Sequence, residues 1–425
     1  MPFGLTNVIH DSPCCLTGHY IPYLHLSRSL RFSSLDEYQY WHHHGPMLGK
    51  LLFDGNYSVH RQYEYLCLFA HLIVPSLGPF PSPGRELFQC ILGSTGPFEL
   101  SQNFTKTRST TRIAFEPTSH RATTGQDPFN RALLPCALHD LKATGSTINL
   151  DLHHALLERL TLSDSDIARL PPTEIAKLPF KTQTILALDL DPAGVSIKEY
   201  FYPTLKGQVT AQSATQLCLD AIRTIDSEQL FAQGCDALQE YLQQPEQKAD
   251  IFLVSCNLVD PHRTRLKFYL AEFDVRFDRV IEHWTMGGRL AKEDPDITEG
   301  LSMLEELWRA LDIVEGPRAY PTRPSQPGDP PTYLPLMLNY EIHPGRRAPI
   351  PKFYFPTSGI PDTKVAAVLT DFFERHDMSD QAAVYAANLQ NCFAGENLDE
   401  TTHHQAWLSF SYARSRGPYL TVYYH

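Results

Sequence analysis

Five segments of the chain share one pattern of apolar and polar positions, in which an apolar-rich run, a turn and a second such run follow one another. Strand-type residues on both sides of a turn rich in Gly, Pro, Asp, Ser or Thr are typical of a β-hairpin. The five predicted hairpins span residues 97–117, 184–203, 250–271, 336–356 and 406–425. The pattern therefore predicts ten strands in five antiparallel pairs.

Helical periodicity fills the intervals between these hairpins. Apolar residues recur every three or four positions in residues 35–53, 60–74, 211–225, 228–242, 301–313, 362–375 and 379–389. The unit of helix, strand, strand and helix thus repeats about five times, which indicates a repeat architecture. We expect an α+β fold in which ten antiparallel strands close into a barrel wrapped by helices.

A proline-rich stretch interrupts this order at residues 317–335, which contain seven prolines. It is either a linker between two domains or a surface loop within one domain. The hairpin design is the same on both sides of it, which favours the loop. We therefore expect one domain over residues 1–425, with N-terminal helices in 1–90 and the repeated units in 91–425.

Composition narrows the range of partners. The chain has 425 residues and a net charge of −12, which disfavours general binding to nucleic acid or to anionic membranes. No apolar run is long enough to cross a bilayer, and residues 65–77 are predicted to form a buried helix. The sequence shows no signal-peptide pattern, and its nine cysteines include no CxxC pair. We therefore expect a cytoplasmic protein with reduced thiols.

The candidate chemistry lies on the second strand of each hairpin. Side chains at positions i and i+2 share one face of a strand, and this face repeatedly carries Lys, Arg and Tyr. The residues are Arg112, Lys198, Tyr200, Arg265, Lys267, Tyr269, Lys352, Tyr354, Tyr419 and Tyr423. One Lys-x-Tyr pair is best explained by a solvent-facing strand. Its recurrence, almost without carboxylates in an acidic chain, favours a common inward face instead.

An inward ring of cations needs a counter-ion, because buried charges are costly when they are unpaired. A diphosphate fits, since arginine and lysine both bind phosphate oxygens. Tyrosine rings stabilise a nearby cation by roughly 0.5–2 kcal/mol each. The face is therefore typical of a site where an allylic diphosphate ionises to a carbocation.

Glu99 is the candidate carboxylate on a first strand. Facing inward, its carboxylate could accept a hydrogen bond from an indole N–H group and raise the electron density of the ring. The alternative is a structural ion pair with Arg112, one hairpin turn away. The histidine runs 42–44 and 403–404 lack metal-site spacing and are predicted to lie at the surface. No DDxxD, P-loop or GxGxxG motif is present, so we expect neither a metal nor a cofactor.

Seven segments, taken in their order along the chain, carry a resemblance to a known family. They are PFELSQNF, RIAFEP, IKEYFYP, SCNLVDPHRTRLKFY, MGGR, PKFYFP and PYLTVYY. With WHHHGPMLGKLL and VPSLGPFP before them, they cover nearly the whole chain. The sequence resembles the fungal indole prenyltransferases of the dimethylallyl tryptophan synthase family, whose fold is the ABBA prenyltransferase barrel.

The resemblance implies an isoprenoid diphosphate held by the ten cationic and tyrosine residues given above. It implies that Glu99 anchors the ring nitrogen of the acceptor, near the backbone of Ile91 and Leu92. The implied reaction is a metal-independent electrophilic aromatic substitution that moves a prenyl group, expected to be dimethylallyl, onto an indole-type acceptor. Whether the chain works as a monomer or as a homodimer stays open.

The sequence departs from the family pattern at two places. Relatives that use tryptophan carry an arginine just before the segment SCNLVDP, where this chain has Phe252. This favours a neutral or bulkier acceptor, such as a tryptophan-containing cyclic dipeptide or an indole alkaloid. Some relatives also carry a lysine base in the segment matching 184–188, which this chain lacks. Three alternatives remain: a non-indole aromatic acceptor, a non-catalytic carrier of isoprenoid diphosphate, and a repeat protein that binds an acidic partner.

Overall fold

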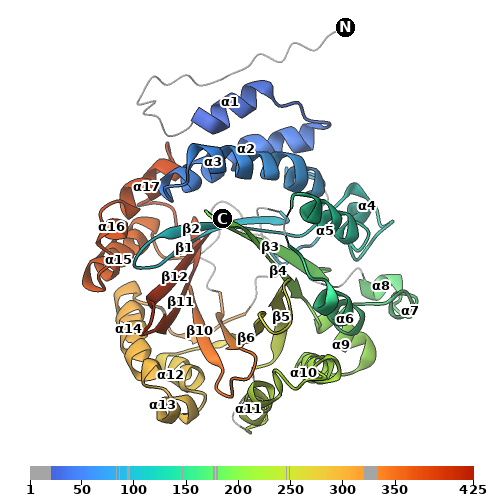
Figure 1. The fold of residues 1–425 in the computed structure, drawn as a ribbon, viewed down its shortest axis with the longest axis vertical. Coiled ribbons are helices and arrows are strands. Elements are labelled where there is room, and N and C mark those ends of the chain that lie inside the picture. The colour runs from blue at the N-terminus through green and yellow to red at the C-terminus, as the bar shows by residue number, and fades with distance from the viewer. Residues whose placement is uncertain are drawn as a thin grey trace.

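Ten antiparallel strands form a closed barrel at the centre of the molecule. The computed structural model describes residues 21–82, 84–85, 87–92, 96–145, 147–175, 178, 180–245, 247, 249–319 and 334–425. The strand order around the barrel is β1-β12-β11-β10-β9-β6-β5-β4-β3-β2. Figure 1 shows these strands enclosed by helices. The predicted α+β barrel wrapped by helices is confirmed.

Each predicted hairpin supplies two neighbouring strands of the barrel. The strands are β1 (Phe98–Phe104), β2 (Ser109–Phe115), β3 (Thr184–Asp191), β4 (Gly194–Phe201), β5 (Ile251–Asn257), β6 (Leu266–Glu272), β9 (Leu336–Ile342), β10 (Ile350–Pro356), β11 (Gln405–Ala413) and β12 (Gly417–Tyr424). The first and last strands, β1 and β12, pair with each other and close the barrel. A separate two-stranded sheet joins β7 (Asp274–Val275) to β8 (Gly316–Pro317).

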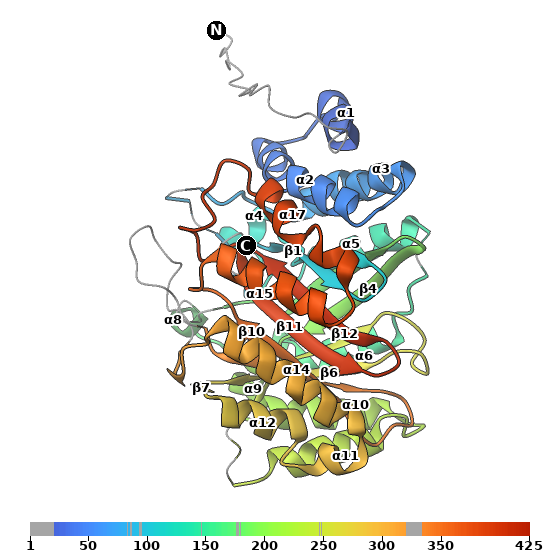
Figure 2. The ribbon, with the colours of Figure 1, turned by 90° about the vertical axis from the view of Figure 1, so that its left-hand side faces the viewer.

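Helices cover the outside of the barrel. They are α1 (Ile21–Ser29), α2 (Leu35–Asp54), α3 (Val59–Leu68), α4 (His120–Thr123), α5 (Leu134–Ala143), α6 (Asp151–Leu160), α7 (Asp164–Ile167), α8 (Pro172–Ile175), α9 (Thr204–Thr210), α10 (Ala214–Ile225), α11 (Ala232–Leu242), α12 (Phe277–Thr285), α13 (Arg289–Glu293), α14 (Pro295–Leu311), α15 (Asp362–Arg375), α16 (Ser379–Ala382) and α17 (Tyr385–Cys392). Figure 2 shows α1, α2 and α3 stacked on one side of the barrel. The described residues contain no helix that is long and apolar enough to cross a membrane.

The main hydrophobic core lies between the barrel and the helices. The outward residues Ile113, Ile197, Phe268, Phe353 and Leu420, one from each hairpin, all belong to it. Burying such a side chain contributes roughly 1.5–3 kcal/mol, which fixes which face of each strand points outward. The alternate positions on the same strands, which carry Lys, Arg and Tyr, therefore face the interior of the barrel.

Several helices begin or end away from their predicted limits. Helix α10 begins at Ala214 instead of residue 211, because Ala211 adopts a left-handed conformation that ends α9, and Ser213 caps α10. Helix α14 begins at Pro295 rather than residue 301, since Asp294 caps it and proline is well suited to the first helical turn. The segment predicted at 379–389 divides into α16 and α17.

The buried segment 65–77 is helical but not uniformly α-helical. Helix α3 ends at Leu68, a π-helical turn follows over Phe69–Ile73, and a 3-10 turn over Val74–Ser76 ends the segment. Pro75 has no backbone N–H, so it cannot continue the α-helical hydrogen-bond ladder. The change of helix type near this proline accommodates the missing donor.

Two further expectations meet the structure differently. Most of the proline-rich stretch, at residues 320–333, lies outside the described residues, so its prediction as a loop stays a prediction. The expectation that the histidine runs lie at the surface is wrong for His44 and His404, which are buried. His44 packs its ring against Phe98, and His404 donates or accepts a 2.8 Å hydrogen bond with Glu396.

Candidate active site

The inward residues of the five hairpins converge on one polar region inside the barrel. Each of the ten predicted Lys, Arg and Tyr residues takes part. Arg112 on β2 interacts electrostatically with Tyr419 and Tyr423 from β12 and with Tyr200 from β4. Lys267 on β6 likewise interacts with Arg112. Strands far apart in the sequence therefore place their charges around a common space.

Two carboxylates neutralise part of this charge. Asp189 on β3 is paired with both Arg112 and Lys198. Glu341 on β9 is the partner of Arg265 and Lys267, each at 2.8 Å. Two carboxylates from first strands, β3 and β9, therefore supply counter-charges for four of the five predicted cations, so a bound polyanion is not their only partner.

Lys352 on β10 has a different environment. Its Nζ donates a hydrogen bond of 3.2 Å to Thr421 and lies 4.7 Å from the ring centre of Tyr419. No ion pair with a carboxylate is found for it among the described residues. The five predicted cations face two paired carboxylates, Asp189 and Glu341, which leaves a surplus of three positive charges when the lysines are protonated.

Burial and mutual repulsion disfavour the protonated lysines. Burial, followed by the charge of Arg112, lowers the pKa of Lys198 to about 7. Burial and Arg265 lower the pKa of Lys267 to about 8. Burial and Lys267 hold the pKa of Lys352 well below its ordinary value. A polyanion in this space would relieve the repulsion and favour the charged form of all three.

Four tyrosines form a continuous row beside the cations. The ring centres of Tyr200 and Tyr269 are 5.7 Å apart, those of Tyr269 and Tyr354 6.1 Å, and those of Tyr354 and Tyr423 5.9 Å. The side chain of Asn339 donates a 3.0 Å hydrogen bond to the hydroxyl of Tyr354. The row supplies aromatic faces, which attract a cation, at the edge of a region that attracts anions.

Glu99 faces the interior two positions from Ser101, which pairs with Arg112 across β1 and β2. Arg112 binds Asp189 rather than Glu99, so a structural ion pair between Glu99 and Arg112 is not formed. Glu99 instead contacts His425, with 2.9 Å between Oε2 and Nε2. The carboxylate also interacts electrostatically with Tyr200 and Tyr423.

Ile91 and Leu92 lie against the same part of the interior. They pack with a small apolar cluster from β2, β3 and β4, composed of Ala114, Ile185, Ala187 and Tyr200. Ala114 is the cross-strand neighbour of Glu99. The predicted acceptor contacts, Glu99, Ile91 and Leu92, are therefore brought to one region.

The backbone N–H groups of these two residues are already engaged. Ile91 donates to Thr182 Oγ1 at 3.0 Å, and Leu92 donates to Cys90 Sγ at 3.4 Å. Thr182 and Cys90 in turn donate to the buried carboxylate of Glu116 at 2.7 and 3.1 Å. Burial raises the pKa of Glu116 to about 7. The N–H groups of Ile91 and Leu92 are therefore occupied, and their carbonyl oxygens are the backbone groups left to contact a ligand.

Phe252 lies at an irregularity of β5. The pairing of β5 with β6 shifts between Ile251 and Leu253, which leaves Phe252 as the extra residue of a β-bulge. Leu253 is then opposite Tyr269, and both Phe252 and Leu253 are half-buried. Neither side chain can bind a carboxylate, and the preference for a neutral acceptor that Phe252 indicates stays a prediction.

Three residues of the site were missed by the sequence interpretation. Asp189 and Glu341 belong to first strands, on which Glu99 was the only candidate, although Glu341 and Asn339 already follow the i, i+2 pattern. The third, Arg416, lies in the last hairpin turn, 5.0 Å from the ring centre of Tyr419, and donates to Ser411 at 2.8 Å. Its place in a turn gave no sign that it would reach the barrel.

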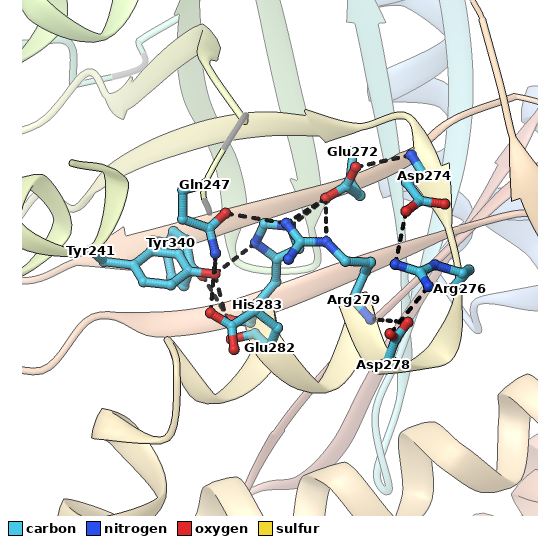
Figure 3. Close-up of polar contacts among 10 residues, drawn as sticks. All are labelled: Tyr241, Gln247, Glu272, Asp274, Arg276, Asp278, Arg279, Glu282, His283 and Tyr340. Carbon is cyan, nitrogen blue, oxygen red and sulfur yellow. Dashed lines mark hydrogen bonds and ion pairs between the residues drawn. The ribbon is translucent and has the colours of Figure 1, made fainter. Parts of the chain in front are cut away.

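A second polar cluster lies outside the barrel wall, between β6, β9, α11 and α12 (Figure 3). Glu272 accepts hydrogen bonds from His283 at 3.0 Å and from Arg279 Nε at 2.9 Å. The other ring nitrogen of His283 lies 2.9 Å from the hydroxyl of Tyr241, and Tyr340 donates to the His283 carbonyl at 2.6 Å. The cluster joins two helices to the barrel; Glu272 and His283 are buried within it, whereas Arg276 and Asp278 are exposed.

We expect the substitution Glu272→Gln to lower the free energy of unfolding by about 3 kcal/mol at neutral pH, because it leaves the largely buried Arg279 without its carboxylate partner. Burial alone would raise the pKa of Glu272, but hydrogen bonds from His283, Asp274 and Arg279 lower it from 4.5 to about 2. The carboxylate therefore stabilises the fold above pH 4.5, and this contribution is lost as the pH falls toward 2.

Urea unfolding of parent and variant over this pH range measures the difference. The control is Glu305→Gln on α14, whose side chain is 38% exposed, and which should change stability by less than about 0.5 kcal/mol. Equal stability of the Glu272→Gln variant and the parent at neutral pH would contradict a stabilising role.

Comparison with known proteins defines the class to which this fold and site belong. The family described as tryptophan dimethylallyltransferase matches residues 36–388. The chain belongs to this family of aromatic prenyltransferases. Its barrel is the ABBA prenyltransferase fold, and the resemblance drawn from the sequence motifs is confirmed.

Individual relatives cover nearly the whole chain. Roquefortine prenyltransferase roqD from Penicillium rubens is 52% identical over 406 residues, 95% of each chain. Prenyltransferase nanD from Aspergillus nanangensis is 42% identical over 416 residues, again 95% of each. The crystal structure of NotF in complex with brevianamide F and DMSPP has a TM-score of 0.84 and 32% identity, and the match covers 95% of this chain and 98% of NotF.

Proposed function

We propose that this prenyltransferase moves a dimethylallyl group from dimethylallyl diphosphate to the indole ring of a neutral, amide-bearing acceptor. One observation carries the proposal: a surplus of buried cations lies directly beside a row of four tyrosine rings inside a closed barrel. The cations suit the leaving group, and the rings suit the allylic cation that remains. NotF, which has the same fold, was crystallised with brevianamide F and DMSPP.

The first step in this proposal is heterolysis of the allylic C–O bond. The electron pair leaves with the diphosphate, whose growing charge is stabilised by Arg112, Lys198, Arg265, Lys267 and Lys352. Preorganised charges of this kind act strongly where water is excluded. The tyrosine rings Tyr200, Tyr269, Tyr354 and Tyr423, together with Tyr419, shield the cation from water and stabilise it.

The second step is attack of an indole ring carbon on the cation. A new C–C bond forms, and loss of one proton restores the aromatic ring or leaves a neutral indolenine. Glu99 accepts a hydrogen bond from the indole N–H group, and this contact raises the electron density of the ring as it attacks. Because Glu99 is a carboxylate held at the inner wall, it also orients the ring relative to the tyrosines.

The surroundings of Ile91 and Leu92 favour an amide-bearing acceptor over a free amino acid. Their N–H groups are engaged by Thr182 and Cys90, so they offer carbonyl oxygens to an acceptor. A cyclic dipeptide has amide N–H donors for such oxygens. A carboxylate would be repelled there and would find no cation at Phe252. These features support a tryptophan-containing cyclic dipeptide or a related indole alkaloid as acceptor.

We propose further that the reaction needs no bound metal. The protein itself supplies five cations for the leaving group. The described residues contain no group of three or more His, Cys, Asp and Glu side chains that could hold a metal ion. Turnover should therefore be unchanged by EDTA, and abolition of turnover by EDTA with recovery on adding Mg²⁺ would contradict this part of the proposal.

The decisive experiment is incubation of the protein with dimethylallyl diphosphate and a panel of acceptors, followed by mass spectrometry and NMR of any product. We expect a single dimethylallyl adduct on tryptophan-containing cyclic dipeptides and much less on free tryptophan. Binding of the diphosphate without any adduct across indole and phenolic acceptors would support a carrier instead. An adduct on phenolic acceptors only would overturn the choice of indole.

Binding of the diphosphate should take up protons and weaken at high pH. In the empty barrel the pKa values of Lys198 and Lys267 are about 7 and about 8. A bound anion raises both pKa values. The affinity for the diphosphate is therefore highest below the pKa values of the two lysines in the empty barrel. It falls as the pH rises through these values, by up to about tenfold per pH unit for each lysine. Titration calorimetry in two buffers of different ionisation enthalpy measures the uptake.

The matched control for this prediction is Lys198→Arg, which keeps a charge that does not titrate. We expect this variant to take up fewer protons on binding than the parent. Proton uptake of zero in the parent at pH 8 would mean that the lysines are already charged in the empty barrel.

A further inference from the structure

His425 is the direct cross-strand neighbour of Glu99. The register of β1 and β12 pairs Leu100 with Tyr424, so the next positions along the two strands are Glu99 and His425. Nε2 of His425 lies 2.9 Å from Oε2 of Glu99, and the two side chains are 18% and 12% exposed. This contact occupies one oxygen of the carboxylate that the proposed function assigns to the acceptor.

The main chain around His425 is fixed by a second set of contacts. Its N–H donates to the carbonyl of His404 at 3.1 Å, and its own carbonyl lies 3.3 Å from Nδ1 of His404. The titratable groups nearest to His425 from the packed elements are Glu99 on β1 and, before β11 or on α15, His403, His404, Glu396 and Asp362. The imidazole is thus held against Glu99 rather than resting on the surface.

We propose that His425 is a positioning residue for Glu99, whose carboxylate it keeps turned toward the acceptor through a hydrogen bond from Nε2–H to Oε2. The inference rests on the proposed role of Glu99. Nothing in the amino-acid pattern suggested it, because the two residues are 326 positions apart.

The physical reason lies in the two oxygens of the carboxylate. A donor on Oε2 restricts rotation of the side chain, so that Oε1 can meet the acceptor N–H in one geometry. Without His425, the Glu99 side chain would sample more rotamers. Loss of His425 should therefore affect the step that uses the acceptor and leave binding of the diphosphate unchanged.

The test compares His425→Ala, His425→Gln and the parent in steady-state kinetics across pH with a cyclic dipeptide acceptor. We expect His425→Ala to lower kcat/KM for the acceptor by roughly 10–100-fold. We expect the loss to appear in kcat/KM for the acceptor, while the Kd for inorganic diphosphate stays within about twofold of the parent value. Gln can donate from its amide nitrogen, so His425→Gln should recover part of the loss. The control is His139→Ala, an exposed residue of α5.

A double-substitution cycle separates this role from general damage. If His425 acts through Glu99, then His425→Ala should have little further effect in a Glu99→Gln background. Additive losses, or an equal loss of affinity for inorganic diphosphate, would each overturn the proposal. A parent enzyme without turnover contradicts the proposed function itself, whereas a parent with turnover and a silent His425→Ala variant contradicts only the role of His425.

Discussion

Replacement of Lys352 by methionine should lower kcat/KM for dimethylallyl diphosphate by about 10²–10³-fold without destabilising the protein. The two expectations come from one observation. Lys352 is 3% exposed, donates only to Thr421 and tyrosine ring faces, and is the buried cation of the barrel for which no carboxylate partner is found among the described residues. Its charge is costly in the empty protein and useful once the leaving group is present.

A structural lysine would behave in the opposite way. Removing one partner of a buried ion pair usually costs several kcal/mol, whereas removing an unpaired buried charge relieves a desolvation penalty. Thermal unfolding of Lys352→Met should therefore show a Tm equal to or above that of the parent. Methionine is chosen because it keeps most of the volume of the lysine stem and avoids a cavity.

The control for this prediction is Lys364→Met on α15, whose side chain is 41% exposed. It should leave both turnover and Tm unchanged. A loss of activity in Lys352→Met that is accompanied by a comparable loss of stability would show that Lys352 supports the barrel rather than the leaving group. Full activity would refute the role of the cations altogether.

The substitution Glu99→Gln should lower kcat by about 10²-fold and leave the affinity for the diphosphate within about twofold. Glutamine retains the size of the side chain but loses the charge that enriches the indole ring in electrons as it attacks. Glu99 does not pair with any of the five cations, since its partner is His425. The diphosphate region should therefore not respond to the change.

Calorimetry with inorganic diphosphate and single-turnover kinetics measure the two quantities separately. The matched control is Glu374→Gln, at an exposed position of α15, which should leave both unchanged. If Glu99→Gln weakened binding of the diphosphate as strongly as it slowed turnover, the Glu99 carboxylate would act on the charges that hold the diphosphate. Its assignment to the acceptor would then be wrong.

Much of the barrel could be predicted because its determinants are local. The period of two in segments such as Lys198-x-Tyr200 determines which side chains share one face of the strand. The apolar residues of the opposite face predict that this opposite face packs against the helices. Repetition then distinguished the inward face from an ordinary solvent face. The same local rule failed for helix ends, as at Ala211, where the periodicity predicts the start of a helix but a left-handed residue ends α9, and α10 begins only at Ala214.

The charge balance inside the barrel could be predicted only in part. The cations could be recognised because lysine or arginine recurs at equivalent positions of several second strands. Asp189 and Glu341 are not part of such a repeated motif. Asp189 follows Ile185 and Ala187 on the same face of its strand, so its neighbours gave no sign of a polar interior. Only the pairing of β2 with β3 and of β6 with β9 places these carboxylates beside Arg112 and Lys267.

The sequence by itself determined the ten strands, the inward ring of lysines, arginines and tyrosines, and the membership of the family, because each depends on patterns within a few tens of residues. The tertiary structure alone decided which carboxylates share that ring and that Glu99 meets His425. Those contacts depend on closing a barrel between its first and last strands, and no local periodicity specifies the register of partners that lie 326 residues apart.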